Sequence, residues 1–519
     1  MMMSKLIRAK YVITDPRLRE KGLIEDGAIY IKDGVIVEVG KFKDLKNKYS
    51  DAEQLGSDNC IALPGFIDAH NHGQGLTTFS LGILDDCLEM FMPYWPGRVE
   101  KPINLVYLDA LISAGRQIRS GVTTSMRHDA RTLPSEAYKN ETEAILKANW
   151  EAGLRFSYSI GITDKFGWIY GDNQKFVANL PAELRNEIVE VDSQESRKPV
   201  IDLDEWISIV TGLSERYRDV TTTKIVIGVM GPQWDSDKLL GIKRDIAQKL
   251  GAAMHGPFLE TIYQQMYAEK EFGHSAVEHF SKLGILGPHH SSAHGIWLSE
   301  MDMEIFAQAQ STIIHCPSSN LRFYSGISPV PLLIEKGVNV ALSVDSEGIN
   351  DDDDTYQEMR LAMLLHRQPR KTGRALDEWD VLSMATVNGA RAVALEDRIG
   401  TLEAGKEADI QLVSLERIFS DYIHPSIPPI KAFVYRAKTE DIDLVMVAGD
   451  VVYQNGKHTR FDFAQARKEL NAVMGGVQWP PNPRKAKMVQ KLVPYIQNFY
   501  DQWTPADLKP YHIMNSPFN

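Results

Sequence analysis

Histidine and aspartate side chains recur at the ends of short apolar runs in this chain. The runs CIALPGFIDAH, GVTTSMRH, KLGAAMH, HHSSAH, STIIHC and VNVALSVD end at or next to His70 and His72, His128, His255, His294, His315 and Asp345. Imidazole and carboxylate groups bind divalent metal ions and carry protons. Six of the eight apolar runs in this part of the chain therefore finish in a group that suits metal binding or acid–base catalysis.

The pair His70 and His72 is the clearest local motif for a metal site. Residues two apart on a strand face the same side, and their Cα atoms lie about 6 to 7 Å apart. Both imidazoles can then reach one metal ion at about 2.1 Å. Alone, an H-x-H motif predicts a metal site weakly, because such short motifs also occur by chance.

These groups need elements that hold them together. Between about residues 61 and 398, the six runs and two more, LRFSYSIGI and KIVIGVMGP, alternate with amphipathic stretches such as YQEMRLAMLLHR. Eight alternating strands predict a closed (β/α)8 barrel, although the count alone also allows an open doubly wound sheet. In a barrel the carboxyl ends of the strands form one rim, where catalytic groups lie. Two long connections, roughly 73–110 and 162–222, are predicted to be lids or substrate loops.

Both ends of the chain carry β-type patterns. In residues 1–60, AIYIKDGVIVEVG consists of two alternating runs joined by Asp33-Gly34, a strong hairpin signal. Residues 399–460 repeat this pattern in ADIQLVS and VMVAGDVVYQNGK, with turns expected at Gly449-Asp450 and Asn455-Gly456. Because neither segment is long enough to bury a core, we expect one composite β domain built from both ends, with the barrel (61–398) between them.

The last segment, residues 461–519, is predicted to be a helical and aromatic extension. Its plausible helix, AKMVQKLVPYIQNFYDQW, carries apolar residues at helical spacing: Met488, Leu492, Tyr495, Ile496 and Phe499. We expect this face to pack on the body of the protein or on a second subunit.

Composition narrows the class of protein. The 519 residues, 43% hydrophobic and 24% charged, are typical of a globular chain with more than one domain. A formal net charge of −12 disfavours nucleic acid and favours a small-molecule partner. Three cysteines without a C-x-x-C pair provide neither a disulfide framework nor a thiolate zinc site. No apolar stretch approaches the length of a membrane span, so we expect no membrane association and a cytoplasmic location.

Several longer motifs occur in a fixed order. PGFIDAHNH closes the first barrel run, GVTT opens the second, HCPSSNLRFYSG follows the seventh, Ser-Val-Asp ends the eighth, and IGTLEAGKEADIQLV begins the second β segment. With these motifs the chain resembles the amidohydrolase superfamily, in particular its cytosine deaminase and triazine hydrolase-like branch, over about residues 5–460. The resemblance implies a distorted (β/α)8 barrel with a β-sandwich domain formed by the N- and C-terminal segments. It is specific for the family but not for the substrate.

The resemblance also implies a metal centre. One divalent ion, zinc with iron or manganese as alternatives, would be held by His70, His72, His255 and Asp345. His294 would contact the metal water or the substrate, and Glu260 would be the acid and base. Any one of these histidines alone is more often a core residue, but the ordered set favours a site.

One departure from the family concerns the fifth strand. The family usually has H-x-x-E there, whereas this chain has HGPFLE, which begins at His255 and ends at Glu260. Either a β-bulge at Gly256-Pro257 returns both side chains to the site, or Glu260 lies elsewhere and the acid–base function is altered. We favour the bulge, because this strand offers no other histidine.

A mechanism follows from charge. A divalent ion lowers the pKa of bound water from about 15.7 to about 7, so that hydroxide is available at neutral pH. We hypothesise that Asp345 takes the proton of the water, Glu260 protonates the leaving nitrogen and His294 stabilises the tetrahedral intermediate. The predicted function is a metal-dependent aminohydrolase (deaminase) in which hydroxide attacks an electron-poor carbon of a nitrogen heterocycle or a similar small molecule.

Two alternatives stay open. The same site could displace an amide, urea, carbamate or halide. Alternatively, the chain could be a catalytically inactive amidohydrolase-like scaffold, and only the altered fifth strand supports this alternative. The H-x-E and P-C-x-x-C motifs of the zinc cytidine-type deaminases are absent from the sequence. The resemblance also leads us to expect a homo-oligomer.

Further polar groups lie just beyond the strand ends. Substrate contacts are predicted for Gln74, His128, Trp234, His315, Asn320 and Arg322. Each has a structural alternative: His128 could pack, His315 could act behind the site, Asn320 could cap the turn after His315, and the others could orient loops. The doublet His289-His290 is expected on the surface or in a loop.

Overall fold

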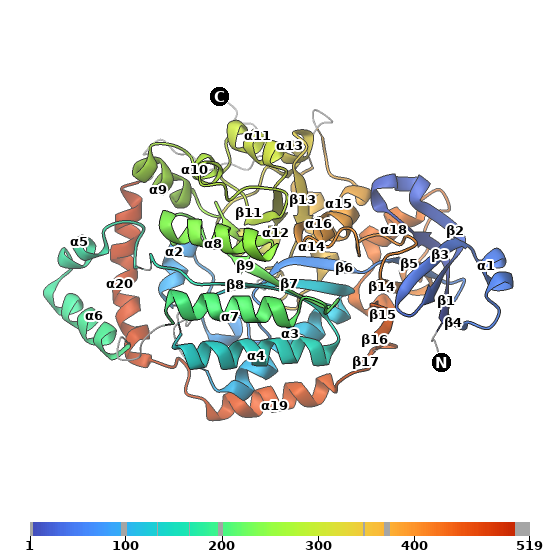
Figure 1. Cartoon of the computed structure of the whole chain (residues 1–519), viewed down its shortest axis with the longest axis horizontal. Helices are drawn as coiled ribbons and strands as arrows, with labels where there is room; N and C mark the ends of the chain where they lie inside the picture. Colours follow the sequence, from blue (N-terminus) through green and yellow to red (C-terminus); the bar gives the residue numbers. More distant parts are fainter. Residues whose placement is uncertain are drawn as a thin grey trace.

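The computed structural model describes residues 4–94, 101–131, 133–165, 167–195, 201–345, 348–367 and 374–503. Two sheets organise these residues (Figure 1). One sheet is an eight-stranded parallel barrel surrounded by helices, and the other is a mixed nine-stranded sheet at one end of the molecule.

The barrel strands run in sequence order around the sheet: β6 (Phe66–Asn71), β7 (Val122–Ala130), β8 (Arg155–Gly161), β9 (Thr223–Gly228), β10 (Met254–Phe258), β11 (His290–His294), β12 (Thr312–His315) and β13 (Asn339–Leu342). Each strand overlaps one of the eight apolar runs that predicted it, although β10 shares only Met254 and His255 with its run and continues to Phe258. Consecutive order without a reversal distinguishes a barrel from a doubly wound sheet, so the (β/α)8 prediction is confirmed.

Side chains join the first and last barrel strands. The backbone N–H of His70 on β6 donates to Ser343 Oγ at 3.0 Å, immediately after β13. The Ser343 hydroxyl in turn donates to Asp68, and the backbone N–H of Val344 donates to the same carboxylate at 3.3 Å. These bonds bring the ends of β6 and β13 together, although the two strands are far apart in the sequence.

Helices cover the outside of the barrel: α3 (Ile103–Arg119), α4 (Ser135–Ala152), α7 (Leu203–Arg216), α8 (Asp237–Leu250), α9 (Ile262–Phe272), α10 (Ala276–Lys282), α11 (Glu300–Ala309), α13 (Val330–Glu335), α14 (Thr355–Leu365), α15 (Glu378–Ala385) and α16 (Val387–Ala392). Their starts follow from local chemistry. The side chain of Ser236 accepts from the N–H of Leu239 at the start of α8, and Ser299 and Asp302 form a capping box at α11.

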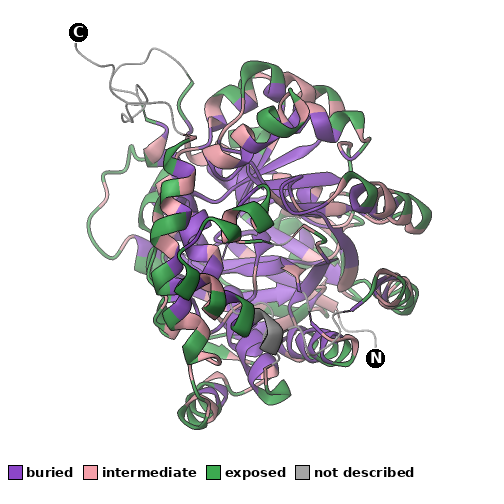
Figure 2. Cartoon of the chain, turned by 90° about the vertical axis from the view of Figure 1, so that its left-hand side faces the viewer, coloured by how far each residue is buried: buried purple, intermediate pink, exposed green. Residues whose placement is uncertain are grey.

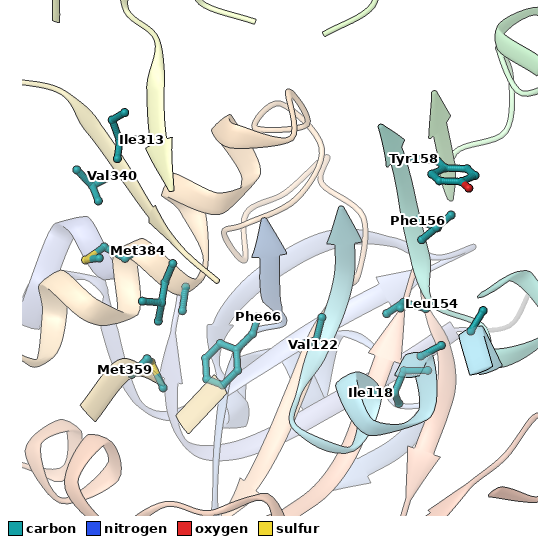
Figure 3. Packing of buried hydrophobic residues seen from close by; sticks show 14 of the residues in the cluster. Phe66, Ile118, Val122, Leu154, Phe156, Tyr158, Ile313, Val340, Met359 and Met384 are labelled. Atoms are coloured by element: carbon teal, nitrogen blue, oxygen red, sulfur yellow. The ribbon is translucent and has the colours of Figure 1, made fainter. Parts of the chain in front are cut away.

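The main hydrophobic core lies between the strands and these helices (Figure 3). Phe66, Val122 and Phe156 of the strands are buried together with Met359 and Met384 of the helices. Burial of each such side chain stabilises the fold by about 1.5–3 kcal/mol. Figure 2 shows the result: buried strands inside a layer of helices whose outer faces are exposed.

The mixed sheet is built from both ends of the chain, as the sequence predicted. Its strand order is β17-β16-β15-β14-β5-β1-β2-β3, and β4 pairs with β1. The strands are β1 (Ser4–Ile13), β2 (Leu23–Lys32), β3 (Val35–Lys41), β4 (Glu53–Gly56), β5 (Cys60–Pro64), β14 (Ile410–Ser414), β15 (Ile442–Val447), β16 (Asp450–Gln454) and β17 (Lys457–His458). The run CIALPGFIDAH is therefore not one strand, because β5 joins this sheet and β6 begins the barrel.

The hairpin turns agree with the prediction in two places and differ in one. Asp33-Gly34 and Asn455-Gly456 all have positive φ, as a two-residue turn of type I′ requires. The turn predicted at Gly449-Asp450 lies one residue earlier, at Ala448-Gly449, where φ is 47° and 84°. Gly449 has to supply the second left-handed position of the turn, and this leaves Asp450 to begin β16.

Arg155 at the start of β8 ties the barrel to the mixed sheet. Its guanidinium is buried and lies 2.8 Å from Asp409 and 2.6 Å from Glu407, which precede β14. Buried charges of this kind need their partners, since an unpaired charge in the interior is strongly destabilising.

The remaining helical elements are short or lie in the long connections and the extension. They are η1 (Pro16–Gly22), α1 (Phe42–Lys48), η2 (Phe79–Leu81), α2 (Leu88–Phe91), η3 (Met92–Tyr94), α5 (Asn173–Ala178), α6 (Ala182–Glu195), α12 (Pro317–Arg322), α17 (Leu415–Ile418), α18 (Pro429–Arg436), η4 (Thr439–Asp441), α19 (Phe463–Gly476) and α20 (Pro483–Asp501). None of the helices in the described part of the chain combines the length and apolarity needed to cross a membrane.

The C-terminal extension packs on the body of the protein. Helix α19 lies along α3, and α20 lies along α6 and α2 at the end of the molecule opposite the mixed sheet (Figure 1). Met488, Leu492 and Ile496 are buried, as their spacing predicted. Tyr495 is 38% exposed, so its assignment to the packed face is wrong; it lies one position round the helix from Ile496 and points away.

The two adjacent histidines at the start of the sixth barrel strand differ in burial. His289 is exposed, but His290 is buried as the first residue of β11. The expectation of a surface or loop position is therefore wrong for His290. Barrel strands are covered on both faces, so a polar residue within one is buried regardless of its polarity.

Candidate active site

The predicted site residues come from the carboxyl ends of barrel strands. His70 lies near the end of β6, His294 ends β11, and Asp345 follows β13 by three residues. His294 and Asp345 both have left-handed backbone conformations, with φ of 72° and 58°. Such conformations cost about 1–3 kcal/mol each for non-glycine residues and cluster at functional sites. They turn both side chains inward where the strands stop.

His70, His294 and Asp345 form a compact cluster. One ligand atom from each lies within 4.8 Å of the others, and all three side chains are buried. His70 Nε2 lies 3.0 Å from Asp345 Oδ1, and His294 Nε2 lies 3.8 Å from Asp345 Oδ2. This spacing suits three ligands that face one cation.

The hydrogen bonding of this cluster also suits a cation. Among the described residues, His70 Nε2 and Asp345 Oδ1 are buried atoms without a hydrogen bond of acceptable geometry, even though they lie close together. Buried polar atoms are normally satisfied, so two that converge without a bond indicate a missing partner. A divalent metal ion fits this donor set of nitrogen and carboxylate oxygen.

His72 and His255 lie next to the cluster. His72 Nε2 is 3.4 Å from Asp345 Oδ1, while its Nδ1 donates to the carbonyl oxygen of His128 at 2.9 Å. This bond leaves the Nε2 lone pair directed at the cluster. His255 Nε2 lies 2.7 Å from His70 Nδ1, and its Nδ1 lies 2.9 Å from Ser291 Oγ. The structure therefore brings together all four predicted metal ligands, with His294 beside them, and their ligand roles stay a prediction.

Glu260 reaches the site without the expected bulge. The pairing of β10 with β11 is regular from Met254 to Phe258, so the prediction of a bulge at Gly256-Pro257 is wrong. Instead Leu259, directly after the strand, has a φ of 51°. This single left-handed residue redirects the chain, and Glu260 Oε2 lies 3.6 Å from His294 Nε2.

Burial and neighbouring charge set the protonation of these groups. Burial raises the pKa of Glu260, which favours the neutral acid, although His294 opposes this. Burial would also raise the pKa of Asp345, but His70, His294 and His72 lower it below its usual range and keep the carboxylate ionised. Burial lowers the pKa of His70 to about 4, so its imidazole is neutral, as a metal ligand must be.

Two residues from the HCPSSNLR motif hold the site in place. Asn320 Oδ1 accepts a hydrogen bond from His294 Nδ1 at 2.9 Å, and Ser319 Oγ donates to Asp345 Oδ2 at 2.7 Å. Asn320 orients His294 through this bond, and its predicted contact with substrate stays a prediction. Ser319 was not predicted, because a serine in a helical turn has no sequence signal that distinguishes this role.

The other predicted substrate residues do not all lie beside the cluster. The His128 ring is buried with its centroid 6.0 Å from that of His70, whereas His315 is buried behind the cluster, with Nε2 3.4 Å from His366 Nε2. Trp234 is buried in an aromatic cluster beyond β9. Gln74 is half-buried two residues after His72.

Arg322 is committed to loop contacts. Its guanidinium lies 2.7 Å from Asp85 and 3.1 Å from Asp351, which belong to the loops after β6 and β13. This geometry favours the alternative in which Arg322 orients loops over direct contact with substrate.

A buried carboxyl next to the site gives a pH-dependent stability. Glu358 of α14 accepts hydrogen bonds from the hydroxyl and the N–H of Ser318, and burial raises its pKa from 4.5 to about 8. Between these values the unfolded chain releases the proton while the folded protein keeps it, so the stability of the folded protein falls as pH rises from 4.5 to 8 and is constant above 8.

Glu358→Gln removes this titration. We expect the variant to gain stability relative to the parent as pH rises from 5 to 8, by up to about 4 kcal/mol. Urea unfolding at pH 5, 6.5 and 8 measures the difference, with Glu269→Gln, at an exposed position on α9, as the control. A difference in stability between Glu358→Gln and the parent that does not change with pH would contradict the raised pKa of Glu358.

The fold and the site together define a class of protein. A (β/α)8 barrel with histidines and an aspartate converging at the carboxyl ends of its strands, beside a buried glutamic acid, is the arrangement of a metal-dependent hydrolase. The sequence model of the amidohydrolase family matches residues 61–452, and the chain belongs to this family. The chain is thus a hydrolase that acts on carbon–nitrogen bonds.

Similar proteins agree in sequence and in fold. The 5'-deoxyadenosine deaminase of Methanosarcina acetivorans is 30% identical over 457 residues, which cover 87% of this chain and 93% of that protein. The 5-methylthioadenosine/S-adenosylhomocysteine deaminase of Nitratidesulfovibrio vulgaris is 26% identical, covering 90% of this chain and 96% of that protein. A zinc-bound adenosine deaminase structure from Xanthomonas campestris has a TM-score of 0.76 at 21% identity, covering 91% of this chain and 98% of that one. An atrazine chlorohydrolase structure from Arthrobacter aurescens, complexed with zinc, has a TM-score of 0.76 at 20% identity, covering 91% and 100%.

Proposed function

We propose that this protein is a metal-dependent aminohydrolase that removes the amino group of an adenine nucleoside as ammonia. The observation that carries the proposal is the convergence of His70, His294 and Asp345, with two unpartnered buried atoms between them and the acid Glu260 alongside. The names of the relatives support the substrate class, since they deaminate 5'-deoxyadenosine, 5-methylthioadenosine and S-adenosylhomocysteine.

We propose His70, His72, His255 and Asp345 as the ligands of one divalent ion; His70 and Asp345 belong to the cluster described above, and His72 and His255 lie next to it. Zinc is the ion we propose, because the similar structures contain it. When bound, the ion supplies acidity, because it lowers the pKa of water from about 15.7 to about 7. The neutral imidazole of His70 and the ionised carboxylate of Asp345 match the needs of a divalent cation.

The protein's own groups then move the protons. Asp345, ionised and held by Ser319, accepts a proton from the attacking water. Glu260, buried and biased toward its neutral form, donates its proton to the ring nitrogen next to the reacting carbon. Asp345 then passes the proton that it took from the water to the departing amine, and Glu260 takes up the remaining proton of the new hydroxyl group as the carbonyl forms. His294, held by Asn320, lies between these two carboxyl groups and stabilises the oxygen that develops negative charge.

Ammonia release tests this proposal. The purified protein, loaded with zinc, is assayed with 5'-deoxyadenosine, 5-methylthioadenosine, S-adenosylhomocysteine and adenosine, and in parallel with guanine and a chlorinated triazine. We expect ammonia from the adenine nucleosides, and loss of activity on chelation with recovery on added zinc. Chloride release from the triazine without ammonia from any nucleoside would replace this function by the hydrolytic alternative. Absence of stoichiometric metal and of all turnover would favour the inactive scaffold.

Two further expectations belong to the proposal. A homo-oligomer and a cytoplasmic location are expected of the working enzyme, together with a small-molecule substrate. Sedimentation of the purified protein measures the oligomeric state directly.

A further inference from the structure

The turn after β6 is held at two points by the end of β7. His72, a predicted metal ligand, donates from its Nδ1 atom to the carbonyl oxygen of His128 at 2.9 Å. The second point lies one residue earlier on β7, where Arg127 Nη1 donates to the carbonyl oxygen of Gly73 at 2.9 Å. Strand β7 therefore fixes both the ring of His72 and the backbone directly after it.

Gly73 allows this close contact. Its φ of 61° lies in the left-handed region, and its N–H donates to the side-chain oxygen of Asn71, which closes the turn. A Cβ atom at this position would lie 2.8 Å from Arg127 Nη1 and 2.9 Å from Arg127 Cδ, which is shorter than van der Waals contact allows. The turn and the guanidinium are thus packed directly against each other, so a displacement of one moves the other.

Arg127 is held in turn by Asp129. Its Nε and Nη2 atoms donate to the Asp129 carboxylate at 2.8 and 3.4 Å. Burial opposes ionisation of Asp129, but Arg127 and Arg131 lower its pKa to about 2, so the carboxylate is charged at neutral pH. The hydroxyl of Tyr158 on β8 donates to the same carboxylate at 2.7 Å. Because Arg127 is only 8% exposed, this paired contact is shielded from water and fixes the direction of Nη1.

We propose that Arg127 is a positioning residue for His72 and that it thereby sets the affinity of the site for its metal ion. The inference rests on the proposed function, because it assumes that His72 is a ligand of that ion. Arg127 acts through the backbone: it holds the carbonyl oxygen of Gly73, so that His72 Nε2 stays directed at Asp345 Oδ1, 3.4 Å away. Groups that orient a metal-binding histidine contribute about 10- to 100-fold in metal affinity.

Zinc affinity tests this inference without turnover. Competition with a chromophoric chelator measures the Kd for zinc of the parent and of three variants. We expect Arg127→Met to weaken zinc binding about 10- to 100-fold, and Gly73→Ala, which forces a Cβ atom against the guanidinium, to weaken it as well. Arg127→Lys keeps one donor for the Gly73 carbonyl but loses the paired contact with Asp129, so its loss should be smaller.

A double-mutant cycle shows whether Arg127 acts through His72. In a His72→Ala background, Arg127→Met should change the zinc affinity by less than about threefold, because the ligand that it positions is absent. Arg155→Lys is the matched control for Arg127→Lys, since Arg155 is also buried and paired with carboxylates but lies at the start of β8, at the amino end of the barrel. It should lower the melting temperature by a similar amount and leave the zinc affinity unchanged.

The outcomes separate the positioning role from the proposed function. Unchanged zinc affinity in both Arg127→Lys and Gly73→Ala, or an equal effect of Arg127→Met with and without the His72 ring, would overturn the positioning role. A His72→Ala variant with the zinc affinity of the parent would overturn it too. Zinc affinity that depends on Arg127 without ammonia release from any nucleoside would instead overturn the proposed function and leave the positioning role in place.

Discussion

Replacement of Asp345 by asparagine is expected to lower kcat by about 10⁴-fold or more while the protein stays folded. The carboxylate lies 3.0 Å from His70 Nε2 and accepts a hydrogen bond from Ser319, and in the proposed mechanism it serves both as a ligand and as the acceptor of a proton. An amide has the same shape and still accepts from Ser319, but it carries no charge and takes up no proton at neutral pH.

Ammonia release, metal content and the melting temperature measure this change together. Asp450→Asn, at an exposed position on β16, is the matched control and should retain full activity. An active Asp345→Asn variant with a full complement of metal would remove Asp345 from the proposed mechanism.

Glu260→Gln is expected to lower kcat by about 10²–10⁴-fold with a much smaller change in KM and no loss of metal. Glu260 is buried beside His294, and burial raises its pKa, which favours the protonated form that the proposed mechanism requires. Glutamine preserves the size and the hydrogen bonding but has no acidic proton to give to the substrate.

The leaving group makes this prediction specific. Ammonia leaves only after protonation of nitrogen, whereas chloride needs no proton, so Glu260→Gln should damage deamination far more than any dechlorination. Glu269→Gln, on the helix that follows, controls for the loss of one carboxylate. Equal activity of Glu260→Gln and the parent on the nucleoside would refute the role of Glu260 as the acid.

Local patterns narrowed the architecture to a barrel or an open doubly wound sheet, and the ordered motifs favoured the barrel. The spacing of apolar residues that distinguishes a strand from a helix depends only on neighbouring residues. Apolar runs that alternate with amphipathic helices then leave few folds other than a barrel. The same logic located the site, because side chains at the carboxyl ends of parallel strands must share one rim. His70, His294 and Asp345 could therefore be chosen from their places at strand ends before any contact between them was known.

The predictions were wrong where a single backbone dihedral angle changes the direction of the chain. The path from His255 to Glu260 depends on the left-handed conformation of Leu259, and leucine carries no preference for that region. The turn at Ala448-Gly449 was misplaced by one residue for the same reason. A chain can be redirected by a single dihedral that the surrounding structure imposes, and the residue type does not reveal it.

The sequence by itself determined the barrel, the sheet shared by both chain ends and the set of histidines at the rim, because these depend on period and order along the chain. Only the tertiary structure decided which groups meet across the rim: Glu89 with Thr261, Tyr170 with Tyr500, and Arg322 with Asp85. These pairs are far apart in the sequence and are joined by packing, which depends on the whole chain at once, whereas a motif depends only on neighbouring residues.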